Sequence, residues 1–339
     1  MTYLLKDKYF PNNFNDFLFH KNRLNFYKNI SYDNFMPNVV IYGPKGSGKY
    51  TIAINVINSL YDKNIKKSLV KFNVLKTPSN YKEVEIFKSN YHYEININKY
   101  LFNDNSTLVN LLNDLINTFS INTLSYKILL IRNVEYLSGE ILDYFKCISE
   151  KYSSTIRLIL LTSNFSAISH KLLGRFSYVR VPSPNNEELR EYIKYIISKE
   201  NVKLSQKNIE TIINNSERNL NKLILSLQFS VSKGTFVPYK DPLKSKIKEI
   251  LGLCNSKNPT NILIIREKAY ELITQNQSID DIFKYLVYYI FKLKVSDDIK
   301  KCLLEYATLY QHRSKICYKE IIHVEAFLMK IMRELSSIK

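Results

Sequence analysis

Residues 38–50, NVVIYGPKGSGKY, decide the fold of this chain. The apolar run 38–43 predicts a short buried strand that ends in a glycine turn. Residues 49–61 follow with apolar side chains at helical spacing, which predicts a helix. A strand, a glycine-rich loop and a helix in this order are the context that a phosphate-binding loop requires.

The loop itself, GPKGSGKY (43–50), follows the pattern G-x-x-x-x-G-K-[ST] except at its last position. Glycines let backbone N–H groups turn towards a phosphate, and the helix N-terminus adds its dipole. Of only seven glycines in the chain, three fall in this loop, which weighs against an accidental glycine turn. We therefore expect nucleotide binding by a contiguous set of residues, in which the lysine reaches the β- and γ-phosphates: Gly43, Pro44, Lys45, Gly46, Ser47, Gly48, Lys49, Tyr50 and Thr51.

The residues that would hold a magnesium ion are altered. Position 50 normally carries a hydroxyl ligand, and here it is Tyr50. A working ATPase also needs carboxylates after a nearby apolar strand, and after KILLI (127–131) stand Arg132 and Asn133. Glu135 lies two residues further on, and its recruitment by a register shift is the alternative. We expect no metal ligands in this chain.

Two further polar residues could act on a nucleotide. Asn164, after the apolar run 157–162, could sense a γ-phosphate, or it could simply cap a loop. Arg175 precedes another short strand and could reach the nucleotide of a neighbouring subunit, because an arginine supplied in trans stabilises transition-state charge. The alternative for Arg175 is a solvated surface arginine.

The order of strands and helices predicts the fold class. Apolar strands alternate with helical stretches, which indicates an α/β domain with a doubly wound parallel sheet over residues 1–182. After VPSP (181–184) the pattern changes to helices, and we expect a three-helix lid over 183–236. A second linker precedes an all-α domain of four or five helices over 237–339.

Composition limits the class of protein. The chain has 339 residues, a formal net charge of +18 and 45% hydrophobic residues, as expected for a folded protein with polyanionic partners. The positive surplus lies mainly in 1–100 and 151–250. No run approaches the ~18 apolar residues of a membrane helix. The four cysteines lack metal-ligand spacing, which favours a reducing, intracellular compartment.

Several motifs together resemble the small subunits of replication factor C, the sliding-clamp loader of the AAA+ superfamily. The resemblance rests on five segments: KDKYFPNNFNDF (6–17), GPKGSGK (43–49), EKYSSTIRLILLTSN (150–164), GRF (174–176) and VPSP (181–184). Two more segments resemble the arc-terminal small subunit, whose catalytic motifs are degenerate: TPSNYKEVEIFKSNYHYEI (77–95) and LYQHRSKICYKEIIHVEAFLMKIM (309–332).

The resemblance implies an AAA+ domain, a lid and a helical collar that joins five different subunits in a ring. It implies ATP or ADP at subunit junctions, and partners in the other subunits, a PCNA-like sliding clamp and primer–template DNA. It matches Lys49 to the nucleotide loop, Asn164 to the first sensor and Arg175 to the finger that acts on the adjacent subunit's ATP. Asn221 stands where the second-sensor arginine usually lies.

We expect a subunit that holds nucleotide, hydrolyses it poorly or not at all, and lends Arg175 to a neighbour. DNA contact is expected at Lys76, Lys82 and Lys88. The expected location is the nucleus or a viral replication compartment, without membrane attachment. One alternative is a self-sufficient AAA+ DNA-dependent ATPase of the helicase or initiator type. Another is a basic DNA-binding module with a vestigial pocket.

Overall fold

The computed structural model describes most of the chain, with gaps. The described residues are 4–19, 36–61, 68–77, 80–97, 105–117, 126–168, 172, 174–200, 202, 204–234, 236, 241–256, 258, 260–275, 277–293, 295–317 and 319–336, without the side chains of 72–82. The chain forms two compact units, Met1–Tyr239 and Lys240–Lys339. Each unit is described by itself.

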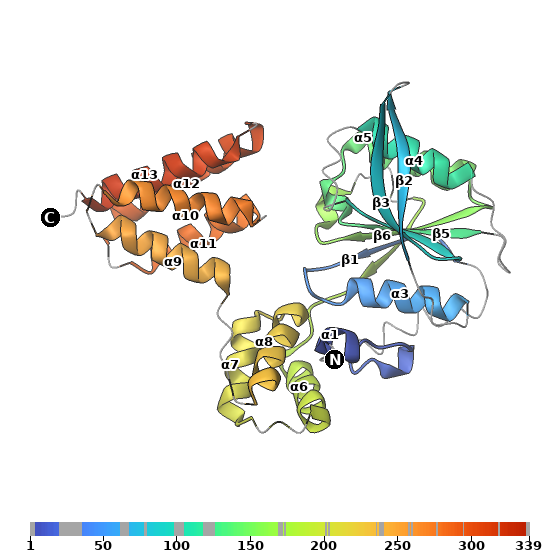
Figure 1. Cartoon of the computed structure of the whole chain (residues 1–339), viewed down its shortest axis with the longest axis horizontal. Coiled ribbons are helices and arrows are strands. Elements are labelled where there is room, and N and C mark those ends of the chain that lie inside the picture. The colour runs from blue at the N-terminus through green and yellow to red at the C-terminus, as the bar shows by residue number, and fades with distance from the viewer. Residues whose placement is uncertain are drawn as a thin grey trace. The chain divides into compact units, whose positions relative to one another are not determined.

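The first unit is built on one sheet with the strand order β2-β3-β4-β5-β6-β1-β7 (Figure 1). Its strands are β1 (Val39–Tyr42), β2 (Ser68–Thr77), β3 (Asn80–Lys88), β4 (His92–Asn96), β5 (Lys127–Arg132), β6 (Ile156–Thr162) and β7 (Ser177–Arg180). The pairs from β4 to β7 are all parallel, so their carboxyl ends meet at one edge. The predicted α/β class is confirmed, and the loop after β1 lies at this edge.

Apolar side chains of the central strands alternate between the two faces of the sheet. Val39 and Ile41 pack on α3 (Lys49–Leu60), whereas Val40 faces the other core cluster. That second cluster includes α4 (Asn105–Asn117) and α5 (Gly139–Lys151). Helices therefore cover both faces, as Figure 1 shows, and both faces of the central strands are buried.

The sheet has an antiparallel extension that the sequence did not predict. β2 and β3 form a long hairpin, with Ser68 opposite Lys88 and Leu75 opposite Tyr81, and β3 then pairs antiparallel with β4. The expected parallel sheet is thus confirmed for its central strands. At the β2–β3 edge the strands are antiparallel, so the sheet as a whole is mixed.

Three helices and a short N-terminal helix form a further hydrophobic core within this unit, apart from those on the two faces of the sheet. The helices are α1 (Leu5–Lys8), α6 (Asn186–Glu200), α7 (Gln206–Ser216) and α8 (Leu220–Lys233). Leu5 is buried in their core, and its N–H donates to Gln228 Oε1 at 2.6 Å. Lys8 forms an ion pair with Glu200 at 2.7 Å, so the N-terminal segment is fixed to α8 and α6.

The second unit contains helices only, among the residues that the structure describes. They are α9 (Pro242–Asn255), α10 (Asn261–Thr274), α11 (Ile279–Phe291), α12 (Asp297–Ile316) and α13 (Glu320–Ser336). Its core is a separate cluster centred on Phe283 and Phe327, whose ring centroids are 5.3 Å apart. The predicted helical C-terminal part is confirmed. No helix that the structure describes is long and apolar enough to cross a membrane.

The domain boundaries remain a prediction. The structure divides once, between Tyr239 and Lys240, and keeps the three-helix cluster α6–α8 in one unit with the sheet. The further division at 182/183 into sheet and lid stays an expectation.

Candidate nucleotide site

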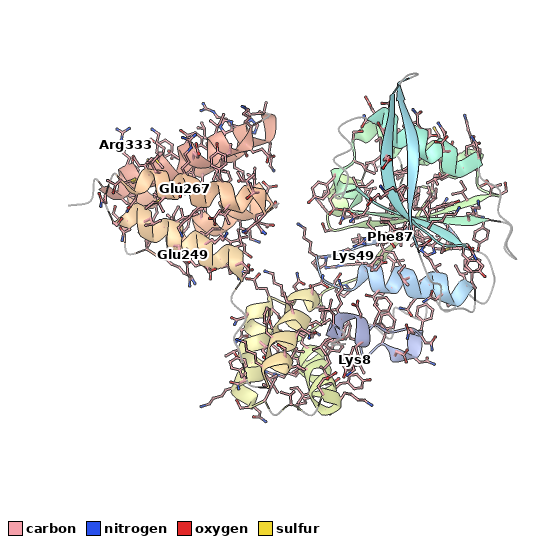
Figure 2. The ribbon with its side chains drawn as sticks, viewed as in Figure 1. Lys8, Lys49, Phe87, Glu249, Glu267 and Arg333 are labelled. Atoms are coloured by element: carbon pink, nitrogen blue, oxygen red, sulfur yellow. The ribbon has the colours of Figure 1, made fainter. Side chains whose placement is uncertain are left out.

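The glycine-rich loop joins the carboxyl end of β1 to the N-terminus of α3, where Figure 2 shows Lys49. Lys49 Nζ donates to the carbonyl oxygens of Gly43 at 2.6 Å and Pro44 at 2.7 Å. Burial lowers the pKa of Lys49 to about 8, against the opposing effect of the nearby Glu135 carboxylate. The ammonium is therefore held within the loop, where an incoming phosphate would be a better partner than a carbonyl.

Two glycines in the loop are required by their surroundings. A Cβ at Gly43 would lie 1.9 Å from the carbonyl oxygen of Val181. Gly46 has a φ of +76°, and a Cβ there would lie 2.0 Å from Asn219 Oδ1. The loop thus needs glycine at these positions for space and, at Gly46, for a left-handed backbone.

The N-terminus of α8 lies directly against the loop. The N–H of Leu220 donates to the carbonyl of Gly46 at 3.0 Å. Asn219 is the N-cap of α8, and its side chain accepts from the N–H groups of Asn221 and Lys222. A segment more than 170 residues away in sequence therefore forms one wall of the loop.

The loop fits a phosphate group. The side chain of Ser47 is fully buried, and its Oγ has no hydrogen-bond partner among the described residues. Gly48 is the N-cap residue of α3 and has a φ of +94°, and no side-chain hydrogen bond caps this helix N-terminus in the described structure. A buried hydroxyl, uncapped helix N–H groups and a lysine in one loop suit the oxygens of an anion.

The two positions that would hold magnesium face a shared carboxylate. The hydroxyl of Tyr50 donates to Glu94 Oε2 at 3.0 Å, and Arg132 Nη1 donates to Glu94 Oε1 at 2.9 Å. The Arg132 guanidinium also lies 4.3 Å from the centroid of the Tyr50 ring. The Glu94 side chain is completely buried, so both charges of this Tyr50–Glu94–Arg132 trio depend on each other.

These residues do not fit a magnesium ion. A guanidinium has no lone pair to offer and carries a positive charge of its own. Asn133 is occupied by Asn96, to which its amide donates at 2.8 Å. Among the described residues, no group of three or more acidic, histidine or cysteine side chains could hold a metal.

Glu135 is the acidic side chain that acts electrostatically on Lys49. Its Oε2 accepts from Thr162 Oγ1 at 3.0 Å and from the N–H of Ser163 at 3.2 Å, and Oε1 bonds to the Ser163 hydroxyl. The end of β6 thereby fixes this carboxylate in place.

The other predicted site residues lie in different surroundings. Asn164 is exposed after β6, and its side chain accepts from the N–H of Ser166, so it caps a 3₁₀ turn. Arg175 is exposed and forms an ion pair with Glu150 at 3.2 Å. Lys88 ends β3, with its ammonium 5.6 Å from the Tyr93 ring. The side chains of Lys76 and Lys82 lie outside the described part of the structure.

The loop itself holds the rest of the predicted set. Pro44 and Lys45 are exposed, whereas Thr51 is half-buried on α3, and its carbonyl accepts from Asn55 Nδ2 at 2.9 Å. The structure brings residues 43–51 and Arg132 to one end of the sheet.

Sequence reasoning missed Glu94 and the contact of Asn219 with Gly46. The signal for Glu94 is a single acid inside the buried strand β4. Asn219 belongs to the NLN stretch 219–221, but its contact with the loop depends on how α8 packs.

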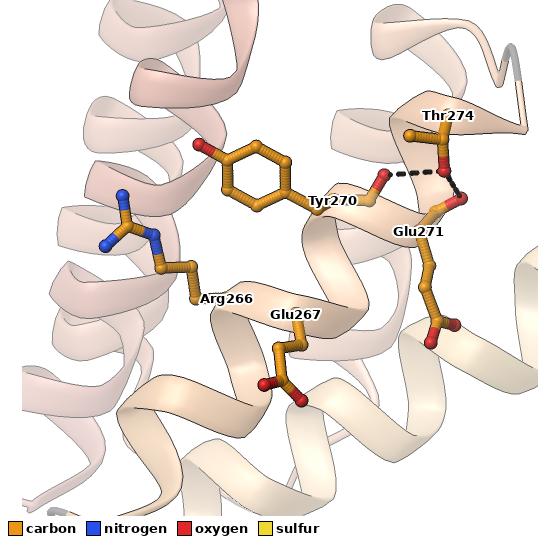
Figure 3. A pocket seen from close by; sticks show the side chains of 5 residues that line it. All are labelled: Arg266, Glu267, Tyr270, Glu271 and Thr274. Atoms are coloured by element: carbon orange, nitrogen blue, oxygen red, sulfur yellow. Dashed lines mark hydrogen bonds between the residues drawn. The ribbon is translucent and has the colours of Figure 1, made fainter.

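A pocket on the helical unit shares no residue with the loop (Figure 3). It is lined by one face of α10: Arg266, Glu267, Tyr270, Glu271 and Thr274. Thr274 Oγ1 donates to the carbonyls of Tyr270 at 3.0 Å and Glu271 at 3.1 Å. Arg266 lies over the Tyr270 ring at 5.8 Å and pairs with Glu325 at 3.0 Å. This second arginine–tyrosine–glutamate group is a useful comparison for the trio at the loop.

The chain is similar to replication factor C subunits along nearly its whole length. Residues 247–339 match the family described as replication factor C subunit 3, C-terminal domain. The probable replication factor C subunit 3 of Dictyostelium discoideum is 28% identical, over 96% of both chains. Replication factor C subunit 3 of Homo sapiens is 26% identical, over 96% of this chain and 94% of that protein. The resemblance to the replication factor C small subunits is therefore confirmed.

The fold has relatives among solved structures. A mutant of Thermotoga maritima RuvB aligns with a TM-score of 0.51 at 13% identity, covering 83% of this chain and 91% of that one. This likeness concerns the fold alone.

Proposed function

We propose that this chain, whose relatives over 96% of its length are replication factor C subunits 3 and 5, is one subunit of a clamp loader. It assembles with other replication factor C-like subunits, five in all, and the complex loads a PCNA-like clamp onto primer–template DNA. The site of action is the nucleus or a viral replication compartment. Co-purification from the source with four related subunits and a clamp is the expected result, and a homo-oligomer by light scattering would contradict it.

Within the complex the chain holds ATP or ADP and hydrolyses it poorly or not at all. The observation that carries this proposal is that the phosphate-binding loop keeps its glycines and Lys49, whereas Arg132 and Asn133 stand where the catalytic acids belong. Residues 43–51 would hold the phosphates, with Lys49 as the cationic partner.

The purified chain tests this directly. We expect nucleotide binding that Lys49→Ala abolishes, together with no DNA-stimulated turnover. Turnover by the chain alone above about 1 s⁻¹, the low end for enzymes, that disappears with Lys49→Ala would contradict the non-catalytic role.

Arg175 acts on the ATP of a neighbouring subunit. Support comes from its exposure and from its ion pair with Glu150, an exposed contact that another anion can replace at small cost. In a reconstituted complex, Arg175→Ala should lower ATP turnover and leave assembly intact. The matched control is Arg190→Ala, because Arg190 is also an exposed arginine paired with a glutamate. Unchanged turnover in the Arg175 variant would reject the role.

One observation favours the alternative of a self-sufficient AAA+ ATPase. The Glu135 carboxylate lies close enough to Lys49 to oppose the lowering of that residue's pKa by burial. If Glu135 has taken over the catalytic role, the chain alone will hydrolyse ATP, and Glu135→Gln will stop it while nucleotide binding persists.

DNA contact is proposed at Lys76, Lys82 and Lys88 on the β2–β3 hairpin. Phosphate contacts predict that log affinity falls with log salt by a slope of roughly −0.9 per phosphate on duplex DNA. Replacing all three lysines in the complex should make this slope shallower, and an unchanged slope would move the DNA surface elsewhere.

A further inference from the structure

The Tyr50–Glu94–Arg132 trio stands where a phosphate-binding loop keeps its metal. Tyr50 follows Lys49 on α3, at the position of the hydroxyl ligand, and Arg132 ends β5, at the position of the carboxylate ligand. In this chain the two side chains lie against each other, with the guanidinium 4.3 Å from the ring centroid. Neither position therefore carries its usual metal ligand, and one of them carries a cation.

Glu94 fixes that cation in position. Its side chain is 0% exposed and uses one carboxylate oxygen for Arg132 and the other for Tyr50. A buried carboxylate orients an arginine far more strictly than solvent would, because Arg132 cannot leave without stranding the buried charge of Glu94. The arginine is thus held by the protein and not by a ligand.

The guanidinium keeps an open edge. The ion pair with Glu94 occupies Nη1, the ring of Tyr50 covers one face, and 32% of the Arg132 side chain remains accessible. An arginine has five N–H donors in a planar fork that matches phosphate oxygens. Tyr50 directly follows Lys49, so the trio adjoins the loop that would hold the phosphates.

We infer that Arg132 takes the place of the magnesium ion, so that the chain binds nucleoside di- and triphosphates without a metal. This inference rests on the proposed nucleotide binding and specifies which cation neutralises the negative charge of the phosphates. In a phosphate-binding loop with its usual ligands, a bound metal ion supplies the positive charge that balances the phosphates. Here the Arg132 side chain, held by Glu94 and Tyr50, supplies that positive charge.

The test is calorimetric titration of the full chain with ADP and with ATP, once in excess EDTA and once in millimolar magnesium. We expect wild-type dissociation constants that agree within about twofold between the two buffers, because no step of binding recruits the metal. Arg132→Gln should weaken binding at least about tenfold in both buffers, since it removes a charge-assisted contact.

Removing Arg132 alone leaves Glu94 buried without its cation and could unfold the sheet. The double variant Glu94→Gln with Arg132→Gln removes both charges and keeps two groups that can hydrogen-bond. It should fold and show the same loss of affinity. Arg266→Ala is the matched control, because Arg266 belongs to an arginine–tyrosine–glutamate group on the helical unit, and it should bind as the wild type does.

A gain of function completes the test. Arg132→Asp and Tyr50→Thr restore the two ligand types when combined with Glu94→Gln, which leaves no buried carboxylate without its cation, and we expect magnesium to tighten nucleotide binding in this variant only. Wild-type binding that tightens tenfold or more with magnesium overturns the inference and leaves the proposed function standing. Binding by the folded double variant equal to that of the wild type also overturns it. Absence of nucleotide binding in both buffers overturns the proposed function itself.

Discussion

We expect Lys49 to make nucleotide affinity depend on pH. Burial has lowered its pKa to about 8, while Glu135 opposes and Lys45 reinforces that shift. A phosphate prefers the protonated amine, so binding takes up a proton where the free chain has lost one. We expect affinity to be constant below pH 7 and to fall above pH 8, by up to about tenfold per unit for one linked proton.

Titration calorimetry across this range measures the effect. Lys49→Arg should retain binding and lose the pH dependence, because a guanidinium remains charged. A pH-independent wild type would show that the amine does not lose its proton in the free chain.

Gly46 sets the shape of the loop. Gly46→Ala should destabilise the sheet unit by about 1–3 kcal/mol, because its φ of +76° disfavours a side chain and its Cβ would overlap Asn219. Urea unfolding measures the loss. The control is Gly139→Ala, where a Cβ meets nothing within 4 Å. Adding Asn219→Gly should recover part of the loss, and an effect equal to that of the control would refute the constraint.

At the scale of single residues, the sequence predicted the residues of the loop but not the contacts between the residues around it. The spacing of GPKGSGK identified Lys49 and the loop glycines, because a phosphate loop is local in sequence. It also identified Tyr50 and Arg132 as misfits. It did not predict that they meet, because their contact runs through Glu94, which reaches Arg132 only through the register of β4 beside β5.

The start of α8 is the element whose capping has two roles. Asn219 accepts from the N–H groups of Asn221 and Lys222, and it also packs against Gly46. Asn219→Ala should cost about 1 kcal/mol for the cap and should also weaken nucleotide binding through the loop. Ser205→Ala, which removes the N-cap of α7, should lower stability to a similar extent and leave nucleotide binding unchanged. Thermal unfolding and nucleotide titration of both variants separate the two cases.

The elements themselves were predictable to different degrees. The central strands and α5 follow from continuous apolar runs and helical periodicity, which are properties of single segments. The β2–β3 hairpin was not predicted, because its strands mix charged and apolar residues and its register comes from pairing at the sheet edge.

At the scale of the whole molecule, the two units have separate cores. Phe145 lies in the core around the sheet and Phe327 in that of the helical unit, and both are fully buried. Each change to alanine should destabilise its own unit by about 3–5 kcal/mol and leave the other unchanged. Hydrogen exchange measured separately for each peptide can report the stability of both units in one experiment. Equal destabilisation of both units by either variant would mean that they unfold together.

Helix α8 also connects the loop to the start of the chain. At one end, the N–H of Leu220 is bonded to the carbonyl of Gly46, and two turns later Gln228 holds the N–H of Leu5. If phosphate binding shifts the loop, we expect α8 to pass this displacement on to the N-terminal segment, because a helix is a rigid element. We therefore expect the environment of the Leu5 N–H to change when nucleotide binds to the distant loop.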